Sequence, residues 1–442
     1  MIVSISQASL VAREARFFLR TAKFVGVTLL CCICISTCVA DDDLPAGFLR
    51  LKGEYVDVIT DLPLDAELRA LPVVFDAAMP RWCEEFDMEL EDVADWHVEA
   101  FIMLRRDEFQ KAGFIPAELP PFPYGFQFGN QVWVVDQPSS YYRRHLLLHE
   151  GTHWFMNRKY GDHGPPWLME GTAEWLGTHR WDGKNLTLGI IPKTKAEVDY
   201  WGRISLIQQQ LTDGVAPSLE DILRYDSKAH QNVEAYAWSW AAVIFLKNHP
   251  HTSKAFSELL EQKMTQDQTL TRWLFRKLQS QWPQIRREWN AMLTELEYGY
   301  DPSQGMLAMS RLAKPIGDKP VTLVLATNRT WQTPGVKVAE GDTVIIEGQG
   351  EYSVCEKPKP WRCQAAGVTL EYYRGEPLGK LMMTVAGTLD KENFSQPIRV
   401  IAVGSQLEYT AEQSGELHFR INESSGGLGD NSGTVTVTIL KQ

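Results

Sequence analysis

The chain has 442 residues, which is more than one hydrophobic core usually serves, so two or three domains are expected. Hydrophobic residues make up 44% of the chain, and this content excludes an intrinsically disordered protein. The formal net charge is -12, and no long block of Lys or Arg is present, which excludes a nucleic-acid partner because phosphate binding needs a basic surface.

The first 40 residues have the pattern of an export signal. Four basic residues precede a mostly apolar run over 24–40, and three aspartates follow it. We predict a signal peptide over 1–40, cleaved after Ala40, and a secreted, periplasmic or cell-surface protein. Two alternatives attach the chain to a membrane: an uncleaved signal anchor, although the run is slightly shorter than the ~20 residues that span a bilayer, and a lipid on Cys38.

Three cysteines follow this segment, namely Cys83, Cys355 and Cys363. Export permits a disulfide between the last two, and two free thiols are the alternative. The count excludes a structural zinc site made of cysteines.

Strands and helices alternate between 54 and 137. Apolar alternation and β-branched residues predict strands, while a longer periodic stretch predicts a helix. The strands are expected over 55–60, 97–103 and 131–135, the helix over about 64–86, and a proline-rich loop over 116–123.

A predominantly helical block follows. Two helices, over 141–160 and 166–181, are joined by a loop whose glycines and prolines stop the first helix and start the second. Four more helices are expected over 198–211, 233–249, 253–263 and 270–296.

The composition changes after Asp301 to β-branched, alternating segments punctuated by glycine. We predict a domain boundary near 310–320 and place a mainly helical α+β domain with a small mixed sheet over 41–310. An all-β sandwich of ordinary size is expected over 311–442.

The segment His149-Glu150-Gly151-Thr152-His153 is an HExxH motif within the helix predicted over 141–160. Positions four apart share a helix face, so both imidazoles can reach one metal ion. Glu150 follows the first ligand and can take a proton from a water near that ion, which is the role of a catalytic base.

The next predicted helix carries Glu170 and Glu174, again four apart. Catalytic zinc takes three protein ligands and leaves one position open, and Glu170 can be the third ligand. Glu174 can accept a hydrogen bond from the second ring nitrogen of a zinc-bound histidine. A solvated carboxylate on the helix surface is the alternative for Glu174.

Other histidines compete for the third ligand position. His145 lies eight residues from His153, about 12 Å along a helix, so the three histidines of this helix cannot bind one ion. His163 and His179 have no supporting spacing, and we expect surface or capping roles. The metzincin class is excluded because Met156 and Lys159 stand where its motif needs Gly and His.

The HExxH motif followed by Trp167-Leu168-x-Glu170-Gly171-x-Ala173 resembles the gluzincin class of zinc peptidases, which includes thermolysin and the aminopeptidases. The resemblance implies a gluzincin-like metallopeptidase domain, a peptide or protein substrate and a zinc cofactor. It also implies a tyrosine or histidine from a later helix at the oxyanion, for which Tyr236 is the candidate. A core position is the alternative for Tyr236. No aminopeptidase motif such as Gly-Ala-Met-Glu-Asn is present, which favours an endopeptidase.

A glycine-rich loop over 420–433 is dense in oxygen ligands. Calcium binds six to eight oxygens, so Glu423, Asp430 and Asn431 can hold it, and an ordinary turn between strands is the alternative.

Most of 320–442 resembles the small calcium-dependent galactose-binding bacterial lectins. This resemblance implies Gly427 as a carbonyl ligand of calcium, Tyr352 near another carbonyl ligand, and a lectin-like domain that binds glycans. Gln364 is the nearest match to a sugar-contacting residue.

We therefore expect an exported zinc peptidase with a calcium- and glycan-binding module. The alternative is a non-enzymatic cell-surface or glycan-binding protein with a structural metal site. The intact Glu150 favours the enzyme, because a structural site has no need of a base.

Overall fold

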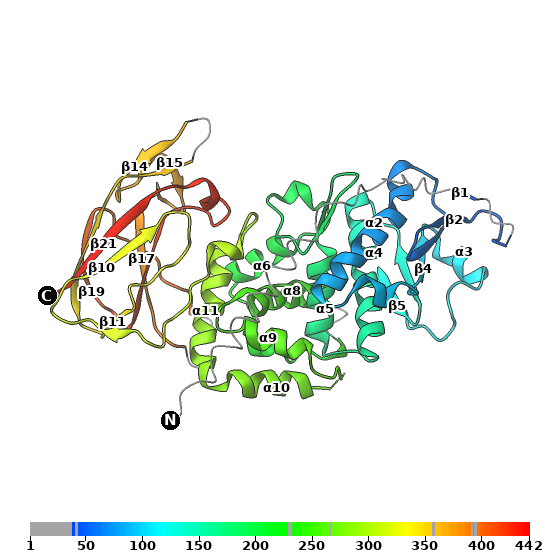
Figure 1. Cartoon of the computed structure of the whole chain (residues 1–442), viewed down its shortest axis with the longest axis horizontal. Coiled ribbons are helices and arrows are strands. Elements are labelled where there is room, and N and C mark those ends of the chain that lie inside the picture. Colours follow the sequence, from blue (N-terminus) through cyan, green and yellow to red (C-terminus); the bar gives the residue numbers. More distant parts are fainter. Residues whose placement is uncertain are drawn as a thin grey trace, which may run out of the picture. The chain divides into compact units, whose positions relative to one another are not determined.

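The computed structural model describes residues 38–39, 43–228, 232–265, 267–355, 359–389, 392 and 396–442 (Figure 1). The predicted signal peptide and its cleavage point at Ala40 lie outside these residues except for 38 and 39, so they stay predictions. Among the described residues, none of the helices combines the length and the apolar character needed to span a bilayer.

A six-stranded mixed sheet lies at the N-terminal end of the described chain (Figure 1). Its central strands are parallel and the outer pairs are antiparallel. The order is β1 (Cys38–Val39), β2 (Leu49–Lys52), β3 (Val56–Thr60), β4 (Val98–Met103), β6 (Gln131–Val135) and β5 (Gly125–Phe128). The predicted strands over 55–60, 97–103 and 131–135 are confirmed, and β5 is the edge strand.

The two faces of this sheet bury different clusters, as the alternation of side chains along a strand requires. Alternate apolar residues of β3, β4 and β6 pack with α2 (Ala66–Glu85) and α4 (Ser140–Tyr160). Phe101 and Trp133 face the other way and pack with Phe109 of α3 (Arg106–Lys111). Helix α4 thus packs on one face of the sheet.

The helices form a second core around α8. They are α5 (Pro166–Gly177), α6 (Arg203–Thr212), α7 (Leu219–Ile222), α8 (Val233–Asn248), α9 (Ser253–Leu260), α10 (Thr269–Leu278) and α11 (Trp282–Glu295). Helix α8 is apolar on nearly all sides and buried, as expected of a central helix. A Cβ added at Gly171 of α5 would lie 2.6 Å from Val243 Cγ2 of α8, so this glycine permits close packing of the two helices.

Four of the predicted helices differ from the structure by three residues or more. The helix predicted over 166–181 ends at Gly177, because Thr178 leaves the helical conformation and starts the hairpin of β7 (His179–Trp181) and β8 (Leu186–Leu188). The helix predicted over 198–211 begins only at Arg203, after Gly202 in a left-handed conformation with φ 60°.

The helix predicted over 270–296 is two helices, separated by a turn at Gln279–Gln281. Pro283 occupies the first turn of α11, where its missing N–H costs no hydrogen bond, and so marks a new helix start. Helix α9 also ends at Leu260, three residues before the predicted end.

Two antiparallel sheets form the C-terminal part and share one core. The first has the order β10 (Val321–Ala326), β21 (Thr434–Lys441), β12 (Thr343–Gln349) and β19 (Gln406–Thr410). The second has the order β18 (Ile401–Ala402), β17 (Leu381–Ala386), β20 (Gly415–Ile421), β11 (Val336–Val338) and β9 (Lys314–Pro315), with β9 parallel to β11. Two hairpins are added: β13 (Tyr352–Val354) with β14 (Trp361–Cys363), and β15 (Val368–Tyr373) with β16 (Glu376–Leu378).

The expected disulfide between Cys355 and Cys363 is wrong. Cys363 pairs with Tyr352 across the β13–β14 ladder, and Cys355 lies three residues further along the strand. Three residues of strand span about 10 Å, beyond the reach of a disulfide. The buried Cys363 instead packs in the core of the C-terminal sheets.

The chain is therefore a mixed α+β protein with several sheets, as predicted at this level. Helix α11 ends at Glu295, before the predicted boundary at 310–320, and β9 begins at Lys314, within it. The domain ranges themselves stay predictions. Contacts join Cys38–Gln442 into one compact unit.

Candidate metal centre

Helix α4 carries the two histidines of the HExxH motif on one face. Ser139 caps its N-terminus by accepting a hydrogen bond from the Tyr142 N–H, and Gly161 ends it in a left-handed conformation. Opposite the histidines, Gly151 lies against α2, where a Cβ would come 2.7 Å from Phe75 and Trp82. This packing fixes the rotation of α4, so His149 and His153 both face α5.

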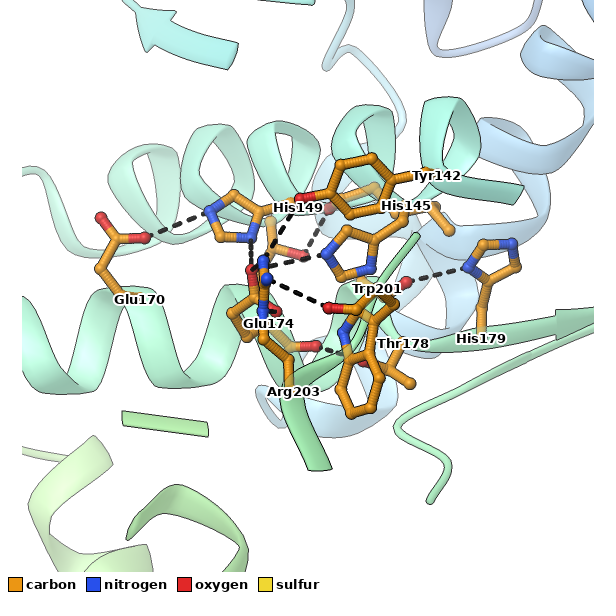
Figure 2. A network of polar contacts seen from close by, with 12 residues as sticks. Tyr142, His145, His149, Glu170, Glu174, Thr178, His179, Trp201 and Arg203 are labelled. Atoms are coloured by element: carbon orange, nitrogen blue, oxygen red, sulfur yellow. Dashed lines mark hydrogen bonds and ion pairs between the residues drawn. The ribbon is translucent and has the colours of Figure 1, made fainter. Parts of the chain in front are cut away.

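Three donor atoms from α4 and α5 converge. Figure 2 shows two of these side chains, His149 and Glu170, facing each other. His149 Nε2 lies 3.2 Å from Glu170 Oε2, and His153 Nε2 lies 3.3 Å from the same oxygen. The two Nε2 atoms are 3.1 Å apart. The predicted group of His149, His153 and Glu170 is thus brought together as a set of residues that could hold a metal ion.

The size of this triangle fits a tetrahedral zinc ion. Bonds of about 2.0–2.1 Å in a tetrahedron place neighbouring ligand atoms about 3.3–3.4 Å apart. The three observed separations are 3.1–3.3 Å. Two imidazoles and one carboxylate also form the ligand type of many catalytic zinc sites.

The pocket favours positive charge at His149. Burial alone lowers the pKa of His149, but hydrogen bonds and charge from Glu170 and Glu174 outweigh it and raise this pKa to about 10. A proton on the ring and a bound cation satisfy the same two carboxylates. The electrostatics therefore suit a cation bound between His149 and Glu170.

Glu174 is buried next to His149, so the alternative prediction of a solvated carboxylate at this position is wrong. Its Oε1 is 3.4 Å from His149 Nδ1 and 3.5 Å from His145 Nε2 (Figure 2). Arg203 of α6 donates to both carboxylate oxygens at 3.0 Å. Although burial raises the pKa of Glu174, Arg203 and His145 lower it well below its usual value. Glu174 thus stays ionised and can orient His149.

Glu150 lies against the edge strand of the six-stranded sheet. A Cβ added at Gly125 of β5 would lie 3.0 Å from Cγ and Cδ of Glu150. Glu150 is itself largely buried, at 6% exposure. The candidate base is therefore held between α4 and the edge strand.

Tyr236 of α8 lies beside the three donors. Its ring centroid is 5.9 Å from that of His149, and the Arg203 guanidinium is 6.0 Å from the Tyr236 ring. Burial, with the charges of Glu170 and Glu150, raises the pKa of Tyr236. The phenol therefore stays protonated and able to donate a hydrogen bond.

The remaining histidines of this region lie apart from the triangle. His145 contacts Glu174 instead of the three donors, and His163 is exposed in the loop between α4 and α5. His179 is buried, stacks on Tyr141 at 4.6 Å between centroids, and makes a 2.9 Å hydrogen bond with the Gly177 carbonyl.

A second buried group contains His249, His251 and Glu288. The His249 ring accepts the His251 backbone N–H at Nδ1 and donates from Nε2 to the Leu307 carbonyl. Both nitrogens of His249 are thus in use. Glu288 also accepts a hydrogen bond from the Met309 N–H, so this group holds the segment that follows α11 against that helix.

The predicted calcium residues lie close together in the C-terminal part. Asn431 donates to Glu423 Oε2 at 2.7 Å, and a Cβ at Gly427 would lie 3.1 Å from Glu423 Cδ. The Asn431 Oδ1 is buried and has no hydrogen-bond partner within the described structure. Burial raises the pKa of Glu423 to about 7. The hydrogen bond from Asn431 lowers this pKa, and the charge of Asp430 raises it further.

Asp430 itself is exposed at the end of a short turn, Leu428–Asp430. Tyr352 is buried and donates from its hydroxyl to the Gln364 carbonyl at 3.0 Å, while the Gln364 side chain is exposed. Of the predicted calcium residues, Glu423, Gly427 and Asn431 are therefore in contact, while the Asp430 side chain faces solvent.

No family model and no curated protein matches the chain. Two solved structures are weakly similar to it. The EclA N-terminal domain, a PllA-like lectin, has 14% identity and a TM-score of 0.22, and the match covers 27% of this chain and 95% of that one. IMPa from Pseudomonas aeruginosa in complex with an O-glycopeptide has 12% identity and a TM-score of 0.17, over 62% of this chain and 27% of that one.

Two residues of the site carry no local sequence signal. Arg203 lies 29 residues from the Glu174 carboxylate that it binds, in a helix with no recognisable motif. Gly125 looks like any other loop or strand glycine. Only the packing of α6 on α5 and of β5 on α4 reveals their positions.

Proposed function

We propose that the chain is an exported zinc-dependent peptidase of the gluzincin type, and an endopeptidase. The observation that carries this proposal is the triangle of His149, His153 and Glu170 donor atoms, 3.1–3.3 Å apart, with Glu150 next to it on the same helix. A purely structural metal site gains nothing from the adjacent base.

Zinc, when bound, supplies Lewis acidity toward a substrate carbonyl and lowers the pKa of a nearby water. Glu150 takes the proton of the attacking water and passes it to the nitrogen of the leaving amine. Glu174, held ionised by Arg203, keeps the His149 ring in the orientation that directs Nε2 toward Glu170.

The substrate class is inferred from strand β5. One edge of β5 has no strand partner among the described residues, since β5 ends the sheet order. An extended peptide can pair with such an edge through its main chain. Because Gly125 of β5 lies against Glu150, a peptide paired there would run past the base.

Tyr236 supports the same reaction as a hydrogen-bond donor. Its raised pKa keeps the phenol neutral, and its ring lies beside His149. We assign Tyr236 to the oxyanion that forms when water adds to the peptide carbonyl, where a fixed donor stabilises the developing charge.

Metal analysis of the purified protein and cleavage of a broad peptide library test the proposal together. We expect about one zinc per chain and cleavage within peptides, not only at their ends. Glu150→Gln should keep the zinc and lose hydrolysis by several orders of magnitude. Cleavage by Glu150→Gln at the wild-type rate would refute the assigned mechanism.

The alternative is a non-enzymatic glycan-binding or cell-surface protein with a structural metal. A structural metal site predicts that the protein contains zinc but cleaves no library peptide. It also predicts that Glu150→Gln has the same melting temperature as the wild type. The two proposals therefore differ in the peptide assay alone.

For the C-terminal module we propose one calcium ion at Glu423, Gly427, Asp430 and Asn431, with a glycan bound nearby. The buried Asn431 Oδ1 and the raised pKa of Glu423 support a cation at this loop. Calcium should raise the melting temperature of the full chain. Asp430→Ala with Asn431→Ala should remove that increase and leave peptide cleavage intact; no effect of calcium on the wild type would make the loop an ordinary turn.

A further inference from the structure

A cavity of about 210 Å³ lies between the C-terminal end of α11 and the sheet that contains β17, β18 and β20. None of the residues assigned to the metal centre or to calcium lines it, although Arg420 and Asn422, at the start of the loop over 420–433, do. Its size is below the roughly 300–1,000 Å³ of pockets for drug-sized ligands, so it suits a ligand of about one ring.

The cavity has a polar wall that carries both signs of charge. Arg420 is buried and forms an ion pair with Glu295, whose other oxygen lies 3.9 Å from Arg374 Nη1. Glu376 adds a second carboxylate to the lining. Donors and acceptors thus stand side by side, and the charges balance.

Met382 and Ala402 lie in register with Arg420 on neighbouring strands, and with Val400 they form an apolar wall beside the arginine. Val400 is 38% exposed and the Arg374 side chain is 40% exposed, so the cavity opens to solvent beside these two residues. A ligand can therefore enter without movement of the buried ion pair.

Trp331 supplies an unsatisfied donor. Its side chain lines the cavity and is only 5% exposed, and its indole N–H has no acceptor within the described part of the chain. A buried N–H without a partner costs free energy.

Arg374 lies at the mouth of the cavity, in the two-residue turn between β15 and β16. Arg374 and Gly375 have φ 50° and 82°, as the tight turn of a hairpin requires, and Arg374 donates to the Thr294 carbonyl at 2.7 Å. The turn holds the guanidinium at the mouth of the cavity.

We propose that this cavity binds one neutral sugar ring, without calcium. Each hydroxyl of a sugar both donates and accepts hydrogen bonds, which matches a wall with arginine and glutamate groups together. An anionic ligand would meet Glu295 and Glu376, and a cationic one would meet Arg374 and Arg420. The C–H face of the ring packs on the apolar wall. This inference deepens the proposed glycan binding of the module and is independent of the peptidase proposal.

The test uses the full chain and three probes of one ring shape: glucose, glucuronic acid and glucosamine, each at millimolar concentration, with galactose as a second neutral ring. Binding is measured by saturation-transfer NMR, with and without added calcium. We expect the two neutral sugars to bind in both conditions, and the two charged sugars to bind about tenfold more weakly.

Two variants locate the binding. Arg374→Asn removes the guanidinium but suits the left-handed turn, and Val400→Trp fills the mouth of the cavity. Both should retain the wild-type melting temperature and lose the sugar signal, while Asp430→Ala should retain it. Failure of every neutral sugar to bind overturns the inference. Sugar binding that needs calcium, is lost in Asp430→Ala and is kept in Val400→Trp would also overturn the inference. Tighter binding of a charged sugar than of the neutral ones would overturn it as well. Peptide cleavage by these variants tests the peptidase proposal separately.

Discussion

Gly125 of β5 and Glu150 of α4 are in direct contact, because the Glu150 carboxylate occupies the space that a side chain at position 125 would need. The two residues are 25 positions apart in sequence. No positive φ is needed at Gly125, so its role here is steric. The contact joins the edge of the six-stranded sheet to the candidate base.

Gly125→Ala should therefore displace the Glu150 carboxylate without touching the three metal donors. We expect zinc content to stay the same and kcat to fall by about tenfold to a hundredfold, the cost of a misplaced catalytic group. Steady-state kinetics beside zinc analysis measure both quantities. Gly129→Ala is the matched control: its φ of +56° makes alanine unfavourable, but the added Cβ has no neighbour within 4 Å. Equal losses of kcat in both variants would show a general effect on β5.

Glu170→Ala removes one of the three donor atoms. We expect zinc to be lost to a mild chelator that leaves the wild type loaded, because two imidazoles alone hold zinc weakly. Glu150→Gln is the control, since its change lies outside the triangle. Equal retention of zinc by Glu170→Ala and wild type would point to another ligand, with His163 the first to replace.

Arg203 should act on the metal through Glu174. Arg203→Lys keeps a positive charge but loses the paired donation to both carboxylate oxygens, so zinc affinity should fall by about tenfold to a hundredfold. Arg203→Met leaves a buried carboxylate uncompensated and should destabilise the fold by about 3–5 kcal/mol. Competition with a chromogenic chelator and thermal melting measure the two effects. The exposed Arg180 pairs with Glu197 at 3.3 Å, and Arg180→Met should change neither.

The buried His179 should make stability depend on pH. Burial lowers its pKa to about 3. Between this value and about 6.5, the unfolded chain binds one more proton than the folded chain, so the contribution of His179 to stability falls as the pH drops below about 6.5. The slope approaches about 1.4 kcal/mol per pH unit well inside this window.

His179→Phe keeps the stacking on Tyr141 and removes the titration. Denaturant unfolding at several pH values from 7 to 5 should therefore show a shallower loss of stability in this variant than in the wild type. The exposed His163→Phe serves as control and should follow the wild type. Parallel profiles for His179→Phe and wild type would contradict a buried neutral His179.

The positions of the site residues on α4 and α5 follow from local rules. Spacings of four residues put His149 with His153 and Glu170 with Glu174, and glycine and proline set the helix ends near 161–166. Helix α8 was also predictable, because its apolar residues form one long run. The bounds and the buried faces of these helices could therefore be predicted from the residues within and next to them.

Long-range packing decides the remaining features. The stretch over 270–296 has one continuous helical pattern, but Pro283 begins a second helix within it. Cys355 and Cys363 are close in sequence, yet the hairpin register separates them. Arg203, Gly125 and the cavity beside Trp331 depend on contacts between distant segments, which no spacing rule describes.

The close approach of α5 and α8 at Gly171 has a consequence for how the proposed zinc would be acquired. The candidate ligand Glu170 is next to this contact, on a helix anchored by apolar packing that needs no ion. We therefore expect the polypeptide to fold first and to take up zinc afterwards, as a bimolecular step. The fraction of active molecules would then follow the free zinc of the compartment where the folded chain resides, and a zinc-starved population could be reactivated without refolding.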